Sequence, residues 1–222
     1  MTPVKHKGLT VLTGSCLLLL FPVGFFGQEV PSSWIPFTAS VAEQSILDFP
    51  ATGHRKIERT GFYARDGHGN SYQEFEWVRT STSPPVSGPT VDVTLHDRPN
   101  QILYLIDPAR KSVRKTRPDA GDLTIKPPTR EEFDQAHKGE KFVGKKVISG
   151  IECEGFQTPA RFSRKYINET WYTPSLNFTV IKATVYVSQY QRSEVLFKDI
   201  RIGTEPDPNL FRLPEGFKEV QK

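Results

Sequence analysis

The chain has 222 residues, of which 36% are hydrophobic and 24% charged, and its formal net charge is +4. So small a net charge excludes a nucleic-acid-binding protein that depends on a strongly basic surface. The length is sufficient for one domain with a hydrophobic core of its own.

The N-terminal 27 residues have the pattern of an export signal. Lys5 and Lys7 precede an uncharged run from Gly8 to Gly27 whose centre is the apolar stretch LLLLF. A short basic region followed by an apolar stretch is typical of a secretory signal. Because the run is just long enough to span a bilayer, a retained anchor is the alternative. We therefore expect a signal peptide or inner-membrane anchor at residues 1–27, and a single exported domain at residues 28–222, in the periplasm or cell envelope.

Strand patterns dominate the first half of this domain. Phe37 to Gln44 alternates loosely, and His54 to Val78 predicts two strands around the turn DGHGN, where glycines supply positive φ. Val91 to Asp97 alternates cleanly between apolar and polar residues, which is typical of a half-buried antiparallel strand. Gln101 to Thr116 predicts a further hairpin, in which an Asp-Pro pair opens the turn.

The middle of the chain contains two proline-rich linkers and one helix. The linkers are Ser81 to Pro89 and Arg117 to Pro128, and both are expected to be surface loops. The helix follows directly in PTREEFDQAHKG, where Thr129 is the predicted N-cap and Gly139 ends the element.

Strand patterns return in the second half of the chain. The predicted segments are Lys145–Phe162, Lys165–Tyr172, Leu176–Tyr190 and Glu194–Ile202. The proline-rich stretch from Gly203 to Phe217 is not expected to form a strand. Roughly ten strands and one short helix predict a mainly β fold, with a single large curved antiparallel sheet or half-open β-barrel.

The stretch GIECEGF contains Cys153, the only cysteine outside the N-terminal segment, so no internal disulfide is expected. Strand alternation places Cys153 and Gly155 on one face and the neighbouring glutamates, Glu152 and Glu154, on the other. We therefore predict a buried, unreactive thiol. The glycines at positions 150 and 155 mark points where a large sheet can bend.

No catalytic or metal-binding motif is recognisable in the sequence. The five histidines lack H-x-H or H-x-x-x-H spacing, and no G-x-S-x-G elbow or phosphate-binding glycine loop occurs. The pair Glu131-Glu132 fits the first turn of a helix better than a glycosidase dyad. We therefore expect a protein that is not an enzyme, with no metal and no cofactor, and an unrecognised hydrolase is the least favoured alternative.

A basic run near the second hairpin is one candidate binding surface. It is either a solvated strand face that keeps an edge from pairing, or an anion-binding patch for lipid headgroups or polymers. Its residues are Arg110, Lys111, Arg114, Lys115 and Arg117.

Aromatic side chains are the other candidate. The chain has 15 Phe, 7 Tyr and 3 Trp residues, and on a curved sheet they either pack a core or line a cavity for a ligand. The candidates for such a cavity are Phe75, Trp77, Tyr104, Trp171, Tyr172 and Phe178.

Taken together, the motifs resemble those of a known group of proteins. In order they are YARDGHGNSYQEFEW, VTLHDRPNQILYLIDPARKSVRK, VGKKVISGIECEGFQT, ETWYTPSLNFTVIKAT and IRIGTEPDPNLFRLPEGFK. From Phe37 to Phe217 the chain resembles uncharacterised exported bacterial proteins, best known from acidobacteria. Its arrangement also looks like the LolA/LolB type of lipoprotein carrier. That resemblance implies a curved, half-open antiparallel barrel, closed by short helices, that holds acyl chains.

These observations predict a non-enzymatic envelope protein. We expect its concave face to bind a hydrophobic or amphipathic ligand, either a lipid or a lipidated protein. The alternative is an envelope interaction or sensor module whose barrel is filled by its own side chains. The two differ in whether the concave face of the sheet is open or plugged.

Overall fold

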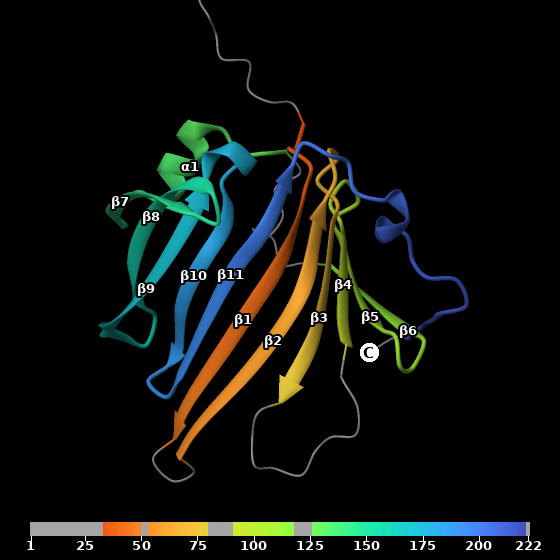
Figure 1. Ribbon diagram of the computed structural model, residues 1–222, viewed down its shortest axis with the longest axis horizontal. Helices are drawn as coiled ribbons and strands as arrows, with labels where there is room; N and C mark the ends of the chain where they lie inside the picture. Colours follow the sequence, from red (N-terminus) through yellow and green to blue (C-terminus); the bar gives the residue numbers. More distant parts are fainter. Residues whose placement is uncertain (1–32, 50–52, 80–90, 118–125, 221–222) are drawn as a thin grey trace, which may run out of the picture.

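The computed structural model describes residues 33–49, 53–79, 91–117 and 126–220, which build one twelve-stranded sheet (Figure 1). The strands are β1 (Phe37–Phe49), β2 (Gly53–Arg65), β3 (Ser71–Arg79), β4 (Val91–Asp97), β5 (Ile102–Asp107), β6 (Ser112–Thr116), β7 (Lys141–Ile148), β8 (Ile151–Ala160), β9 (Ser163–Thr173), β10 (Thr179–Ser188), β11 (Gln191–Ile202) and β12 (Lys218–Glu219). The helices are α1 (Arg130–Ala136) and two 3-10 turns, η1 (Pro174–Leu176) and η2 (Pro208–Phe211).

The predicted fold class is confirmed: the described residues form one large curved sheet, almost entirely antiparallel, with a single short α-helix among them (Figure 1). The expected signal or anchor at residues 1–27 and the linker at residues 81–89 lie outside the described residues. Residues 118–125 of the second linker also lie outside the described residues. In the part of the chain that the structure describes, no helix is long and apolar enough to cross a membrane.

Two antiparallel meanders build the sheet. The strand order is β12-β6-β5-β4-β3-β2-β1-β11-β10-β9-β8-β7. Strands that follow one another along the chain pair as neighbours, so β1–β6 form one meander and β7–β11 the other. The two meanders meet where β1 pairs with β11, from Phe37 opposite Ile202 to Leu47 opposite Gln191. The long strands β1, β2 and β11 therefore lie in the middle of the sheet, and the two-residue β12 forms one of its edges.

One predicted strand is wrong, because Lys145–Phe162 contains a hairpin. β7 and β8 are joined by Ser149 and Gly150, whose φ angles are 51° and 83°. Two successive positive φ values make the tight turn that matches the twist of antiparallel strands. The sequence indicates a strand end at Ser149-Gly150, but the pair Ser-Gly is a weaker hairpin signal than Asn-Gly or Asp-Gly and did not by itself specify the turn.

Cys153 is buried as predicted. Its exposed fraction is 0%, and burial raises the pKa of the thiol to about 11, so the thiol stays protonated at neutral pH.

Gly155 opposes a β-bulge in β7, and a Cβ atom at this glycine would lie 2.6 Å from the ring of Trp171. The glycine therefore does more than permit a bend, because it leaves room for the Trp171 ring against β8.

Two hydrophobic clusters hold the sheet together. The larger one contains buried residues of both meanders, among them Phe37, Val41, Trp171, Ile181 and Phe197. The smaller one lies on β4–β6 and is covered by η2 and the residues that follow it. Its buried members are Val93, Leu95, Ile106 and Val113, with Phe211 and Phe217 packed against them. The predicted alternation of Val91–Asp97 is therefore confirmed, since Val93 and Leu95 share the buried face.

Candidate functional site

A half-open groove lies over β3–β6; most of its lining residues project from the face opposite the smaller cluster, and Val91, Val93 and Ile106 of that cluster border it as well. Its volume is 810 Å³, within the range of roughly 300–1,000 Å³ that is typical of small-molecule sites. Four of its lining residues are direct cross-strand neighbours: Gln73, Thr94, Leu105 and Arg114. Because side chains alternate along a strand, the residues next to them in sequence point to the other face. The same sheet therefore carries both a packed hydrophobic core and an open groove.

Apolar side chains form much of the groove. Phe75 is 5% exposed, and Val91, Leu105 and Val220 also line the space. The guanidinium of Arg59 lies 4.3 Å from the centre of the Phe75 ring and forms an ion pair with Glu43. This part of the groove suits the hydrocarbon part of a ligand.

Arginines and carboxylates share the rest of the groove, which is lined by Arg110 and Arg114 and also by Asp92 and Asp107. Arg114 is exposed, lines the groove from β6 and makes no ion pair within the described part of the chain. Arg110 lies in the β5–β6 turn, where its backbone N–H donates to Asp107 over 3.0 Å. The Arg110 side chain is 84% exposed and lies 3.5 Å from the same carboxylate, so this contact is a weak surface pair. This part of the groove therefore offers arginine donors to an anionic group.

The predicted basic run is divided between two faces. Arg110 and Arg114 line the groove, whereas Lys115 is the cross-strand neighbour of Tyr104 on the other face. Lys111 lies in the turn, where its carbonyl accepts the backbone N–H of Lys218. Arg117 follows β6 and is exposed. The run is therefore not one continuous patch.

The six predicted cavity aromatics are also not brought together. Phe75 alone lines the groove among those whose side chains are described, because the side chain of Trp77 lies outside the described part of the structure. Tyr104 packs in the smaller cluster. Trp171 is buried in the larger cluster, with the Lys146 ammonium 3.5 Å from its ring centre.

The remaining two aromatics, Tyr172 and Phe178, pack against α1. Phe133 of α1 stacks on Phe178 with ring centres 4.1 Å apart, and meets Tyr172 edge-on at 5.2 Å. The helix begins with the predicted cap: the Thr129 hydroxyl accepts the Glu132 N–H, and the Glu132 carboxylate accepts the Thr129 N–H. These two aromatic side chains are thus used in holding the helix on the sheet.

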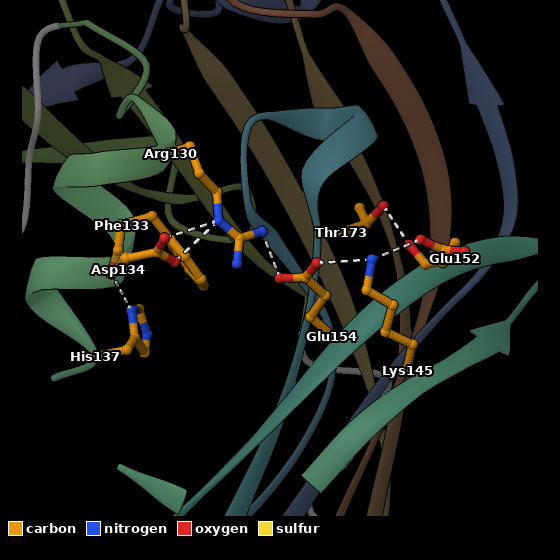
Figure 2. Close-up of polar contacts among 8 residues, drawn as sticks. All are labelled: Arg130, Phe133, Asp134, His137, Lys145, Glu152, Glu154 and Thr173. Carbon is orange, nitrogen blue, oxygen red and sulfur yellow. Dashed lines mark hydrogen bonds and ion pairs between the residues drawn. The ribbon is translucent and has the colours of Figure 1, made fainter. Parts of the chain in front are cut away.

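A buried carboxylate fixes α1 to the sheet (Figure 2). Glu154 of β8 is 3% exposed, and it accepts from Arg130 of α1 at 2.6 Å and from Lys145 of β7 at 3.2 Å. Arg130 also pairs with Asp134, and these partners raise the pKa of its guanidinium. Glu152, two residues before Glu154, is exposed and pairs with Lys145. The sequence predicted that both glutamates face away from the thiol, but not that one of them anchors the helix.

Arg65 is a second buried charge that sequence reasoning did not assign. It is 3% exposed and donates to the carbonyls of Ile35 and Leu176, both at 3.0 Å, and to the Thr179 hydroxyl at 2.7 Å. The rings of Trp34 and Phe37 each lie 4.8 Å from its guanidinium. Burial lowers its pKa to about 10, although it remains charged at neutral pH.

Asp66 follows Arg65 in the motif YARDGHGNSYQEFEW and has a separate, local role. Its carboxylate accepts the backbone N–H groups of His68 and Asn70, at 2.9 and 2.8 Å, and so shapes the β2–β3 turn. The motif noted in the sequence thus combines a clamp between distant segments with a local turn.

Among the described residues, no group of three or more His, Cys, Asp and Glu side chains is placed to hold a metal ion.

No model of a known protein family matches the chain, and no curated protein matches it. Several solved structures are similar. An uncharacterised conserved protein from Thermus thermophilus is 7% identical, with a TM-score of 0.45 over 84% of this chain and 90% of that chain. MucB in its Pseudomonas aeruginosa complex with MucA is 11% identical, with a TM-score of 0.43 over 86% of this chain. That match covers 60% of the other chain, which is less than two thirds of it.

A LolA superfamily protein from Nitrosomonas europaea is also similar, at 12% identity and a TM-score of 0.32. The match covers 80% of this chain and 90% of that chain. Similarity at this level describes the arrangement of strands and says nothing about ligands.

Proposed function

We propose that this protein is an exported, non-enzymatic envelope protein that binds an amphipathic ligand in the groove over β3–β6. The ligand has a hydrocarbon part and an anionic head, as an anionic lipid or a fatty acid does. The observation that carries the proposal is the row across the groove in which apolar Leu105 lies directly beside Arg114. An apolar site with a few convergent polar groups at its margin is the usual form of a small-molecule site.

Arg114→Glu is expected to weaken binding of a fluorescent fatty acid about tenfold or more, because a charge-assisted contact contributes roughly 1.5–3 kcal/mol. Lys115→Glu is the matched control, since it makes the same charge change at the next residue, on the opposite face of β6. Fluorescence titration measures both dissociation constants. Equal weakening by the two variants would show that only the overall charge matters and would contradict a headgroup contact at Arg114.

The ligand itself is sought by mass spectrometry of lipids extracted from the protein as purified from cells. We expect an anionic lipid that is retained by the Lys115→Glu variant and depleted in Arg114→Glu. No extracted lipid, together with no uptake of the fluorescent fatty acid, would reject lipid binding in the groove.

The open edge of the sheet favours a second candidate, a protein-interaction module. β7 is the last strand in the order, and Phe142 and Val147 on it are 53% and 71% exposed. An exposed strand edge accepts an extended segment of a partner as an added strand. A photo-crosslinker at position 147 is expected to capture one defined partner under this alternative, and the Arg114→Glu variant should capture it equally well. Crosslinking that stays diffuse in cells would reject the edge as a docking site.

A further inference from the structure

The tip formed by the β8–β9 turn and the adjoining end of β10 exposes apolar side chains on a basic background. We define the tip as residues 160–168 together with Val185, Tyr186 and Val187. Figure 1 places it at the end of the sheet opposite α1. The exposed fractions are 42% for Phe162, 41% for Ile167 and 56% for Val187. The tip is thus apolar where the end of a solvated strand is ordinarily polar.

Aromatic rings connect the two strands of the tip. Phe162 and Tyr166 lie with ring centres 5.2 Å apart, and Tyr166 and Tyr186 lie 5.2 Å apart as well. Ile167 and the two valines add further exposed apolar side chains to the tip. The tip therefore presents aromatic and aliphatic groups together, as suits an element that meets a membrane interface.

The charges of the tip have one sign. Arg161, Arg164 and Lys165 are exposed, and Lys165 lies 6.0 Å from the Tyr166 ring centre. Residues 160–168 and 183–193 contain no Asp or Glu. A second copy of the chain would bring the same cations together at a tip-to-tip contact, so the charge pattern disfavours self-association through this surface.

We infer that the tip docks on an anionic membrane surface, with Phe162 and the neighbouring tyrosines at the level of the headgroups. Aromatic rings with one apolar and one polar end favour the membrane interface, and each Lys or Arg close to an anionic leaflet contributes about fivefold in binding. The tip is distinct from the groove, because β9 and β4 are separated by β10, β11, β1, β2 and β3. The inference therefore does not depend on what the groove binds.

The test compares binding of the full chain to vesicles of phosphatidylcholine alone and of phosphatidylcholine mixed with phosphatidylglycerol. Amide hydrogen exchange, read by mass spectrometry, reports which residues meet the vesicle. We expect slower exchange at residues 160–168 with the anionic vesicles only. The local readout separates the tip from any contribution of residues 1–27.

The variant combines Arg164→Glu with Lys165→Glu, and we expect it to weaken binding at the tip about 25-fold or more. Raising the ionic strength should weaken binding of the unmodified protein in the same way. The matched control is Lys198→Glu with Arg201→Glu, an equal charge change on exposed residues of β11, which should leave tip protection unchanged. Protection that is equal on neutral vesicles, or that falls equally in both variants, overturns the inference. So does equal protection by a soluble acidic polypeptide, which would indicate a protein partner.

Discussion

Arg65→Ala is expected to lower the free energy of unfolding by at least about 3 kcal/mol. The guanidinium donates to two backbone carbonyls from different parts of the chain, those of Ile35 and Leu176. Each buried acceptor left without a donor costs roughly 1–3 kcal/mol, and the lost ring contacts with Trp34 and Phe37 add to this. Urea denaturation followed by circular dichroism measures the change as a lower midpoint with an unchanged m-value.

Two further substitutions separate the reasons for this loss. Arg65→Met keeps most of the side-chain volume but no donor, so it should remain close to the alanine variant if hydrogen bonding dominates. Arg201→Ala removes an exposed arginine of β11 and should stay within about 0.5 kcal/mol of the parent protein. Recovery of nearly all stability by Arg65→Met would show that volume, rather than the bonds to the carbonyls, is what Arg65 supplies.

Combining Arg130→Ala with Lys145→Ala is expected to cost about 3–5 kcal/mol, because it leaves the buried carboxylate of Glu154 without either cation (Figure 2). Arg130 and Lys145 are about half exposed, so removing each of them alone costs much less. The loss should appear first as release of α1, detected as faster hydrogen exchange in residues 130–136.

The control adds Glu154→Gln to the double variant. An amide of the same shape carries no charge to desolvate, so this change should restore part of the lost stability. Glu152→Gln in the same background should restore nothing, since Glu152 is exposed. A triple variant with Glu154→Gln that is less stable than the double variant would contradict the view that an uncompensated buried charge causes the loss.

Arg65 and Glu154 both stabilise the framework that carries the proposed sites. Arg65 ties the ends of β1 and β2 to η1 and β10, and Glu154 ties α1 to β7 and β8. Neither lines the groove, so variants at these positions that remain folded should still bind ligand. Stability and binding are thereby separable in this protein.

Local signals in the sequence were sufficient for much of the fold. The alternation of Val91–Asp97, the glycines of the β2–β3 turn and the cap at Thr129 each depend on residues only a few positions apart. Such patterns specify strand, turn and helix start without reference to the rest of the chain. The mainly β class, the single helix and the burial of Cys153 follow from signals of this kind.

Only the tertiary structure decided which face of each strand became core, groove or helix contact. Trp171 and Tyr172 are adjacent, yet one packs in the larger cluster and the other against α1. Arg114 and Lys115 are adjacent, yet only Arg114 lines the groove. The sequence could separate these neighbours by parity, but it could not say what would cover each face. The partners of Arg65 at Leu176 and Thr179 are 111 and 114 residues away, so no local pattern identifies them. Contacts of that kind exist only once the two meanders have paired through β1 and β11.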